Sequence, residues 1–499
     1  MNNLSLPPRH LSQLSEIKPT RDVSITGICD DSRAIQPGDA FLCLPRTTTA
    51  AAEYIRKAEE AGAKAIITVG HLHPSTLPCL HLPGMDEAGK LLRSWFETEH
   101  CNVNCVGITG TDGKTSIAWM LREALSRHPG AAWSVGTLGL VRDPSDIEDI
   151  GNTTPSLITS HRLLAVAQQQ EIGSLIMEVS SHGIEQERIA GIPFGAAIWS
   201  NLGHDHLQDH GGFDAYAALK AQFVSGTAHR GGLAICNADD ENIRKLMAEN
   251  DTTAHFYAHG LYAGDGDRNI DLTWEQELPG MVRFAYRDRE VCIEDIPAGE
   301  FHAENLAAVA LTLILHFGLE FEMLPSLLQG MTAPPGRMQP LEIGRWQVFI
   351  DYAHTPEALE RCLATARTLT RNRLIVVFGC GGARDREKRP EMGAIAVEQA
   401  DMVWITSDNP RSEPPEIIAS EIESGMRKPY PAEVFLELDR KAAIAAAISA
   451  MQPGDSVVIA GKGHESYMEI DGHRTPWSDF DIAADCLHLK EDRRMRLCA

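Results

Sequence analysis

The feature that most constrains this chain is the stretch from Val106 to Ser116. An apolar run ends in small residues, and Gly113-Lys114-Thr115 then leads into a helix-compatible segment, residues 117–126. This order predicts a strand, a phosphate-binding loop and a helix. Glycines let successive backbone N–H groups turn onto an anion, and the helix N-terminus adds partial positive charge. Lys114 can reach the outer phosphates of a nucleotide, and the Thr115 hydroxyl can ligate Mg²⁺.

The stretch departs from the usual phosphate-loop pattern, which has glycine where this chain has Ile108. Its glycines stand at positions 107, 110 and 113. The alternative is a glycine-rich strand-to-helix turn without a ligand. Gly-Lys-Thr directly before a helix favours the phosphate site.

Composition limits the classes of function. The 499 residues are enough for about three domains. A net charge of −24, with no basic cluster longer than Arg493-Arg494, argues against nucleic-acid binding. The 11 cysteines lack Cys-x-x-Cys spacing, the start shows no signal peptide, and no apolar run reaches the ~20 residues that span a bilayer. We therefore expect a cytoplasmic monomer with reduced thiols, and neither a membrane nor a nucleic acid as partner.

Two segments before residue 339 differ in pattern. Residues 1–86 predict a small α/β domain, with strands at 23–28, 40–44 and 65–69 and a helix at 54–61. Residues 87–338 predict the nucleotide domain, because the short apolar runs 174–179, 195–201 and 232–237 each precede polar residues. That is typical of buried parallel strands with functional groups at their carboxyl ends. We expect an antiparallel extension over 250–300 and a hinge at 334–337.

Residues 339–499 predict a Rossmann-like, doubly wound parallel sheet, because strands alternate with helices. The expected strands are 346–351, 373–378, 401–406, 433–436 and 456–460, and the clearest helices are 356–369 and 440–451. Phe378 to Arg384 superficially suggests a dinucleotide fingerprint, but Arg384 stands at the position of its last glycine. Dinucleotide binding there is the weaker alternative. The fold class expected is therefore α/β with three domains.

Three further positions carry candidate chemistry, each with a plainer alternative. Glu178 ends a predicted strand beside the phosphate loop, where its carboxylate can hold Mg²⁺ or simply lie next to a helix cap. Residues 201–211 contain three His and two Asp, which suggests zinc, but no cysteine is nearby and one strand-end side chain beside the nucleotide fits better. Lys220 lies in a mostly apolar helical run, where a snorkelling surface lysine is the simplest expectation.

Taken together, these motifs resemble the Mur ligases, which add amino acids to cell-wall peptides. The resemblance covers nearly the whole chain and rests on the segments 110–115, 178–182, 205–207, 237–240, 336–337, 351–356 and 461–465, with Asn201, Tyr216 and Lys220. Asp408-Asn409-Pro410-Arg411 resembles the signature of the members that add diaminopimelate.

The resemblance implies a role for each matching residue. Catalytic roles fall on Lys114, Lys220, Glu178 and His206. Lys220 is implied to be carbamylated, so that it binds Mg²⁺ with Thr115, Glu178 and His206. The implied ATP-binding residues are Gly110, Thr111, Asp112, Gly113, Lys114, Thr115, Ser116, Asn305, Arg337 and Asp351. The implied UDP-sugar-peptide residues are Ser32, Asn152, Thr153, Thr154, Ser180, Gln186 and Arg188. The implied diaminopimelate residues are Arg384, Asp408, Asn409, Pro410, Arg411, Gly461 and Glu465.

The sequence departs from the family pattern at three places. Residues Arg46 to Glu53 stand where the family tends to have a Gly-x-x-x-Asp-Gly-like segment. The resemblance implies uridine contacts at Ser32 and in the segment after Pro45. Asp112 replaces the usual Asn, and Gln339 stands where Glu is common.

The activity implied is an ATP-dependent, Mg²⁺-requiring amide ligation in peptidoglycan precursor synthesis. The D-glutamate side-chain carboxylate of UDP-N-acetylmuramoyl-L-alanyl-D-glutamate becomes an acyl phosphate, which an amine of meso-2,6-diaminopimelate attacks. The C-terminal domain would bind the amino acid, the central domain ATP and the N-terminal domain the UDP-sugar. The alternatives are a lysine-adding or folylpolyglutamate-type ligase, an ATPase coupled to movement, and a catalytically silent binding protein.

Overall fold

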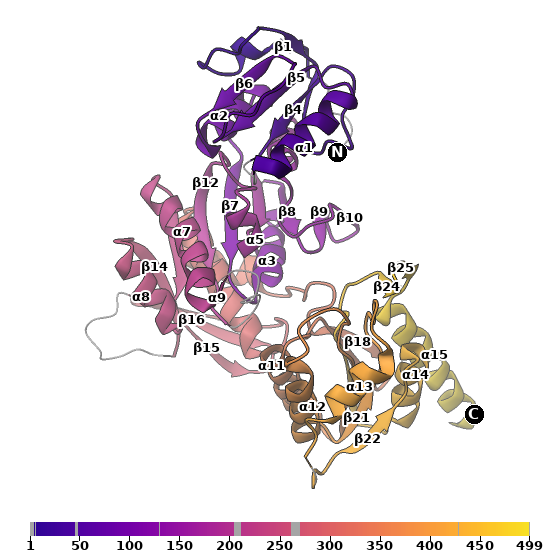
Figure 1. The fold of residues 1–499 in the computed structure, drawn as a ribbon. Coiled ribbons are helices and arrows are strands. Elements are labelled where there is room, and N and C mark those ends of the chain that lie inside the picture. The colour runs from indigo at the N-terminus through magenta and orange to yellow at the C-terminus, as the bar shows by residue number, and fades with distance from the viewer. Residues whose placement is uncertain are drawn as a thin grey trace. The chain divides into compact units, whose positions relative to one another are not determined.

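The structure is a computed structural model that describes residues 4, 6–44, 48–128, 130–203, 211–260, 270–427 and 429–498. It divides into two compact units. The first comprises residues 1–275, 284–291 and 304–328, and the second comprises residues 276–283, 292–303 and 329–499. Figure 1 identifies the elements, and each unit is built around α/β layers.

The N-terminal part of the first unit is a four-stranded parallel sheet with the order β3-β4-β5-β6. Its elements are β3 (Gly27–Cys29), β4 (Asp39–Cys43), α1 (Thr48–Glu60), β5 (Ala65–Val69), β6 (Cys79–Leu82) and α2 (Met85–Trp95). The single strand expected over 23–28 is wrong. β2 (Ser24–Ile25) pairs instead with β1 (Arg9–His10), followed by the short helix η1 (Leu11–Gln13). The break falls at Thr26, whose N–H bonds to the Gly38 carbonyl rather than to a ladder partner.

Helix α2 belongs to the core of this N-terminal sheet. Leu92 and Trp95 lie in the same buried cluster as Ile67 and Leu80. The expected boundary after residue 86 falls inside α2, whose amphipathic face needs this apolar surface.

The central sheet has eleven strands in the order β10-β9-β8-β11-β7-β12-β13-β14-β15-β16-β17. Neighbours from β8 through β15 pair in parallel, and β9 and β10 add antiparallel strands at one edge. The strands are β7 (Asn104–Thr109), β8 (Ala132–Gly136), β9 (Gly139–Asp143), β10 (Asp146–Glu148), β11 (Ser174–Glu178), β12 (Phe194–Trp199), β13 (Leu233–Asn237), β14 (Ala254–His259), β15 (Ile270–Leu278), β16 (Met281–Tyr286) and β17 (Arg289–Ile293). The helices are α3 (Lys114–Ser126), α4 (Leu157–Gln169), α5 (Ser181–Glu185), α7 (Phe213–His229), α8 (Glu241–Glu249), α9 (Glu300–Leu315), η2 (Phe321–Met323) and α10 (Leu324–Leu328).

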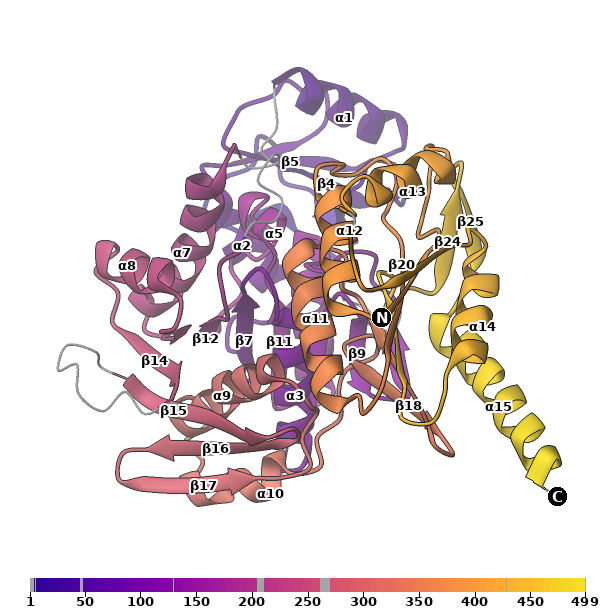
Figure 2. The same cartoon turned by 90° about the horizontal axis from the view of Figure 1, so that it is seen from below.

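The expectation of an antiparallel extension over 250–300 is correct only for its second part. β14 and β15 continue the parallel sheet. β15, β16 and β17 then lie side by side (Figure 2) and are joined by two-residue connections, which antiparallel neighbours alone can use.

The six-stranded sheet of the second unit has the order β18-β19-β23-β20-β21-β22, parallel except for the β18–β19 pair. Its strands are β18 (Gln339–Ile343), β19 (Trp346–Asp351), β20 (Leu374–Phe378), β21 (Met402–Ile405), β22 (Glu433–Leu436) and β23 (Ser456–Ala460), beside a hairpin of β24 (Tyr467–Ile470) and β25 (His473–Pro476). The five predicted parallel strands are confirmed. The helices are α11 (Pro356–Leu369), α12 (Lys388–Gln399), α13 (Pro415–Glu423), α14 (Arg440–Ala450) and α15 (Asp479–Cys498).

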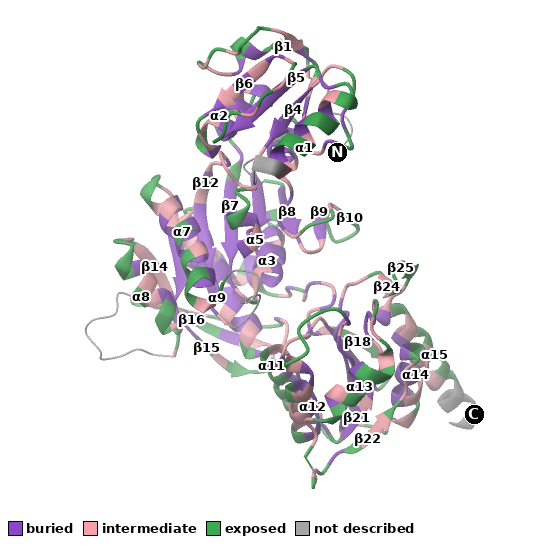
Figure 3. Cartoon of the chain, in the orientation of Figure 1, coloured by how far each residue is buried: buried purple, intermediate pink, exposed green. Residues whose placement is uncertain are grey.

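Helices cover both faces of this sheet, as expected for a doubly wound fold. Val376 packs in a cluster with Leu359 of α11 and Met392 of α12, whereas Ile375 packs with Ile444 of α14. Alternate residues of one strand thus enter opposite cores, and the central strands β20 and β23 are buried along their whole length (Figure 3). Polar groups near these central strands therefore lie at the strand ends.

Candidate active site

The phosphate loop has the predicted strand–loop–helix form. β7 ends at Thr109 and α3 begins at Lys114. Gly110 and Gly113 have positive φ values of 151° and 84°, and a Cβ at either would strike the Ser200 or the Asn305 side chain, respectively. Glycine is required at both positions because the backbone conformation and the close approach leave no room for a side chain.

Lys114 lies folded over this loop. Its ammonium donates to the carbonyls of Gly110 at 2.8 Å and Thr111 at 2.7 Å. It is the first residue of α3, so its charge stands where the helix N-terminus already favours an anion.

Glu178 is the centre of the buried polar cluster beside the loop. Its side chain accepts from the Thr115 hydroxyl at 3.0 Å, the Thr137 N–H at 3.0 Å and the Thr137 hydroxyl at 3.1 Å. A Cβ at Gly136 would overlap the carboxylate. The hydroxyl and the carboxylate are hard oxygen donors of the kind that Mg²⁺ prefers, so the residues present fit the expected metal.

Lys220 is buried rather than exposed, which overturns the surface-lysine alternative. It is 1% exposed, donates to the Gly110 carbonyl at 2.7 Å, and its ammonium lies 4.5 Å from the centre of the Tyr216 ring. Helix α7 thus brings Lys220 to the back of the phosphate loop.

The backbone of the loop is fixed by residues that follow β12. The Asn201 side-chain oxygen accepts from the N–H groups of Thr111 at 3.1 Å and Asp112 at 2.8 Å. The Ser200 hydroxyl donates to the Asp112 carbonyl at 2.6 Å. The Asp112 side chain itself is exposed, so its extra negative charge relative to Asn faces water.

The metal-ligand prediction for His206 lies outside the described residues, as do all the His and Asp side chains of 204–210. Within the described ranges, no three His, Cys, Asp or Glu residues are grouped to hold a metal ion. None of the helices in that part of the chain is long and apolar enough to cross a membrane.

Most of the predicted UDP-sugar-peptide residues lie together. Arg188 donates to the Thr154 carbonyl at 2.9 Å and to the Gln186 side chain. Thr154 also bonds to Ser180, the N-cap of α5, at 3.0 Å. Thr153 bonds to Thr137 at 3.1 Å, which links this set to Glu178.

Ser32 and Asn152 are less closely tied to that set. Ser32 is buried, and Asn152 is exposed next to Thr153. Burial lowers the pKa of Arg188, and the Asp30 carboxylate, two residues before Ser32, opposes that shift. The expected contacts at residues 45–47 lie outside the described residues, and residues 48–53 form the start of α1.

The predicted ATP-binding residues fall in both units. Asn305 lies beside Gly113 in the first. In the second, the guanidinium of Arg337 lies 4.4 Å from the centre of the Tyr352 ring, and Asp351 accepts from the N–H groups of Met338 at 2.6 Å and Ala353 at 2.7 Å. Burial raises the pKa of Asp351, against the influence of Arg337. The unusual Gln339 accepts from the Gly336 N–H at 2.9 Å, so it fixes the turn that carries Arg337.

The predicted amino-acid site is assembled at the carboxyl ends of β21 and β23. The Asn409 side chain donates to Glu465 at 2.7 Å and accepts from Lys462 at 3.0 Å. Lys462 also pairs with Glu465 at 3.0 Å and is fully buried. Asp408 lies against Gly461, whose φ of +109° and lack of Cβ permit this approach.

Arg411 presents its guanidinium from a strained backbone. Its φ is +51°, and its N–H and carbonyl are fixed by Glu469 at 3.1 Å and Asp471 at 2.8 Å. Nη1 donates to the Gly382 carbonyl at 2.9 Å, so Arg411 lies against the loop that carries the exposed Arg384. The two backbone hydrogen bonds to Glu469 and Asp471 hold this left-handed conformation in place.

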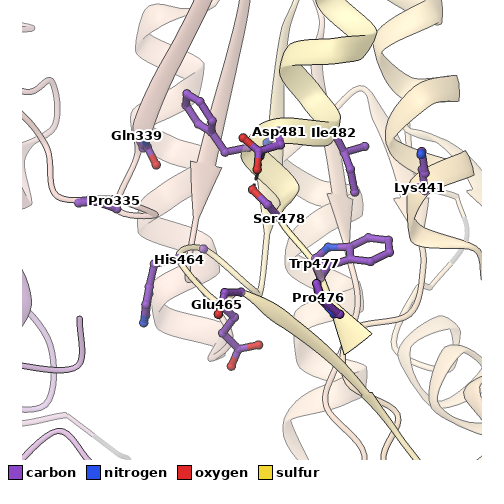
Figure 4. A pocket seen from close by; sticks show the side chains of 13 residues that line it. Pro335, Gln339, Lys441, His464, Glu465, Pro476, Trp477, Ser478, Asp481 and Ile482 are labelled. Carbon is purple, nitrogen blue, oxygen red and sulfur yellow. Dashed lines mark hydrogen bonds between the residues drawn. The ribbon is translucent and has the colours of Figure 1, made fainter. Parts of the chain in front are cut away.

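A pocket in the second unit adjoins this cluster. Figure 4 shows Glu465 and His464 on one loop and Trp477 and Ser478 across from them. Of the residues predicted to bind diaminopimelate, Glu465 alone is among those that line this pocket.

Two residues of these clusters were missed by sequence reasoning as site residues. Thr137 holds both oxygens of Glu178, and Lys462 joins Asn409 to Glu465. The Gly-Thr-Leu-Gly turn after β8 was the available signal for Thr137. Lys462 lies inside the 461–465 motif, of which Gly461 and Glu465 were the predicted ligands.

Comparison with known proteins agrees with this geometry. The profile of the Mur ligase middle domain matches residues 108–313, and that of the Mur ligase glutamate ligase domain matches residues 336–463. The UDP-N-acetylmuramoyl-L-alanyl-D-glutamate–2,6-diaminopimelate ligase of Aquifex aeolicus is 35% identical over 468 residues, covering 93% of this chain and 94% of the relative. The chain belongs to the Mur ligase family.

Two further similarities extend over the same length. The enzyme of that name from Chromobacterium violaceum is 37% identical, covering 92% of this chain and 93% of the relative. A solved structure of a ligase of that name aligns with a TM-score of 0.69 at 27% identity, covering 97% of this chain and all of that one. Mur ligases are ATP-dependent ligases, and this chain is therefore an ATP-dependent acid–amino-acid ligase.

Proposed function

We propose that this Mur ligase adds meso-2,6-diaminopimelate to the D-glutamate side-chain carboxylate of UDP-N-acetylmuramoyl-L-alanyl-D-glutamate, with ATP as the energy source. The observation that carries the proposal is the cluster of Asn409, Lys462 and Glu465 beside Arg411 in the Asp408–Arg411 segment. It combines an anionic acceptor with a planar cation at the strand ends where α/β sheets bind ligands. The relatives at 35% and 37% identity carry the name of this activity.

The first step is transfer of the γ-phosphoryl group to the D-glutamate carboxylate. Lys114 and the loop N–H groups bind and orient the phosphates, and such charge neutralisation is the main catalytic contribution in phosphoryl transfer. Thr115 and Glu178 would hold Mg²⁺, with His206 and carbamylated Lys220 completing the set by family resemblance. Bound Mg²⁺ supplies further neutralisation of phosphate charge.

The second step is attack of the diaminopimelate amine on the acyl phosphate. Phosphate leaves, the amide forms, and the amine gives up a proton. The residues of the second unit contribute orientation here, because holding the amine close to the acyl carbon replaces a bimolecular encounter.

We further propose a division of labour among three domains. The N-terminal domain, 1–86 with the rest of α2, would bind the UDP-sugar. The central domain to residue 338 would bind ATP, and residues 339–499 would bind the amino acid. Thr154, Ser180 and Arg188 support a peptide-binding role for the central domain, because carboxylates and amides are recognised by such hydroxyl and guanidinium groups. The enzyme would act in the cytoplasm as a monomer, in cell-wall synthesis.

The test is a substrate comparison. The protein is given ATP, Mg²⁺ and the UDP-linked dipeptide with meso-diaminopimelate, L-lysine or no amino acid, and phosphate release and product mass are followed. The expected result is a tripeptide of the diaminopimelate mass and little turnover otherwise. Phosphate release without any amino-acid dependence would indicate a simple ATPase, and equal use of L-lysine would indicate a broader ligase.

A further inference from the structure

A buried ion pair lies directly behind the proposed amino-acid site. Arg440, the first residue of α14, and Asp479, the first residue of α15, have fully buried side chains. The guanidinium donates through Nε to Oδ1 at 2.9 Å and through Nη2 to Oδ2 at 2.7 Å. Such bidentate geometry fixes the orientation of the guanidinium plane.

The other donors of Arg440 reach two separate loops. Nη1 donates to the carbonyl of Ser407 at 3.2 Å, and Nη2 donates to the carbonyl of Ala460 at 2.9 Å. Ser407 immediately precedes the Asp408–Arg411 segment, and Ala460 immediately precedes the Gly461–Glu465 segment. One side chain thus joins the bases of the two segments that carry the proposed amino-acid ligands.

These two segments do not follow neighbouring strands. β21 and β23 lie on opposite sides of β20, so no ladder hydrogen bonds connect them directly. Their contacts at the site are the Asn409–Lys462–Glu465 cluster and the approach of Asp408 to Gly461. Besides these contacts among the ligands themselves, Arg440 is bonded to the bases of both segments.

Trp477 adds a further constraint on the pair. Its indole N–H donates to Asp479 Oδ1 at 2.8 Å, and its ring lines the pocket that also contains Glu465 (Figure 4). Asp479 is thereby held from two sides.

We propose that Arg440 is a positioning residue for amino-acid selection, which holds the Asp408–Arg411 and Gly461–Glu465 segments in register through the carbonyls of Ser407 and Ala460. This inference rests on the proposed function. Stability alone is a weak explanation for the pair, since a buried ion pair often stabilises a fold no more than apolar residues of similar volume. Lysine at this position cannot replace the planar fork that reaches two carbonyls and a carboxylate together.

The sheet offers a matched control at its opposite end. Arg373 pairs with Asp455 at 2.7 Å, and the Asp455 side chain is buried. These residues directly precede β20 and β23, at the amino ends of the strands and away from the proposed ligands. Arg373→Lys therefore perturbs another arginine–aspartate pair of the same sheet, with a partly exposed arginine, without touching the loop bases.

The experiment compares Arg440→Lys with Arg373→Lys in the full-length enzyme. For Arg440→Lys we expect the KM for meso-diaminopimelate to rise about 10- to 100-fold, because displaced ligand groups lose binding free energy for the amino acid. The KM for ATP should stay unchanged and the preference over L-lysine should fall. Arg373→Lys should lower the melting temperature but leave both KM values unchanged. Equal effects of the two variants, or a loss in kcat alone, would overturn the proposal.

Trp477→Phe provides a variant that keeps the ion pair and most of the ring, in case Arg440→Lys does not fold. Loss of one hydrogen bond to Asp479 should raise the KM for meso-diaminopimelate by about threefold, again without changing that for ATP. An unchanged KM would count against the proposal. A wild-type enzyme that uses L-lysine equally well would overturn the proposed function itself. A selective wild type with an unaffected Arg440→Lys would overturn this inference alone.

Discussion

The Thr115 hydroxyl donates a 3.0 Å hydrogen bond to the Glu178 carboxylate across 63 positions of sequence. The contact follows from topology, because β7 and β11 are neighbouring parallel strands whose carboxyl ends meet at one edge of the sheet. Thr115 follows the first strand through the phosphate loop, and Glu178 ends the second. Two oxygen donors suited to Mg²⁺ are thus held together by the fold.

Glu178→Gln should weaken metal use while preserving the fold. The amide keeps the size of the side chain but loses the charge that attracts Mg²⁺, so the Mg²⁺ concentration for half-maximal turnover should rise at least about 10-fold. The measurement is a Mg²⁺ titration of phosphate release, with the melting-temperature shift by Mg²⁺ and ADP as a second readout. Glu249→Gln on α8, which removes a carboxylate paired with Lys245 at the surface, should leave both unchanged. An unaltered Mg²⁺ requirement for Glu178→Gln would exclude it as a ligand.

Lys114→Ala should abolish phosphate release. The ammonium lies against the carbonyls of Gly110 and Thr111, within the loop, and a lost charge-stabilising donor at such a site costs about 100- to 1,000-fold in kcat. Lys245→Ala, at an exposed position of α8, serves as the matched control. Near-normal turnover by a folded Lys114→Ala protein would contradict the phosphate-loop assignment.

Lys220→Ala should be nearly inactive, and acetate should restore part of the activity. The lysine is buried beside the loop, and a carbamate or an added carboxylate supplies oxygens for a metal ion that an amine lacks. The direct measurement is ¹³C NMR after incubation with ¹³CO₂. A carbamate signal should appear in the wild type and be absent from Lys220→Ala. Equal signals in both proteins would contradict carbamylation at this residue.

Sequence reasoning reached the fold because its signals were local. The parallel strands of the second unit are short apolar runs bounded by polar residues, and the helices between them follow from length and pattern. Sequence reasoning predicted one strand over 23–28, but the pairing changes at Thr26, whose N–H bonds to the Gly38 carbonyl. β2 before it pairs with β1, and β3 after it pairs with β4. No periodicity reports such a switch of partners.

The site was predictable only where a side chain belongs to a motif. Lys114, Glu178 and Asn409 were predicted in this way. Thr137 bonds to Glu178, and Arg440 bonds to the carbonyls of Ser407 and Ala460. All these partners are distant in sequence, so no local motif contains both members of a pair. Composition favoured a surface position for Lys220, and only the packing of α7 against the loop shows that it is buried.

His161 should make the first unit less stable at mildly acid pH. Burial in α4 lowers its pKa to about 4, while a bond from its Nε2 to the Ala190 carbonyl at 2.8 Å opposes the shift. The folded-state pKa lies below that of the unfolded chain, near 6.5, so protonation favours unfolding. The contribution to stability is complete above pH 6.5 and is lost as the pH falls toward 4.

The size of that loss is about 2 kcal/mol between pH 7 and pH 5. Denaturant unfolding at the two pH values measures it. His161→Gln retains an N–H donor for Ala190 but cannot titrate, and should show a smaller difference between the two pH values. His100→Gln, at an exposed position, should behave like the wild type. An identical pH dependence in His161→Gln would show that this histidine does not carry the effect.

Arg411→Ala should lose most of the preference for meso-diaminopimelate over L-lysine. The two amino acids differ by a distal carboxylate, and the guanidinium of Arg411 offers the planar fork that binds a carboxylate. Its backbone is set at φ +51° and fixed by Glu469 and Asp471, so the side chain is presented with little further loss of entropy. A lost charged pair in a desolvated site costs roughly 2–5 kcal/mol, which corresponds to about 30- to 4,000-fold in kcat/KM. The measurement is kcat/KM for both amino acids.

Arg474→Ala, which removes a more exposed arginine paired with Glu469, should keep the wild-type ratio. A ratio unchanged by Arg411→Ala would show that the distal carboxylate is recognised elsewhere.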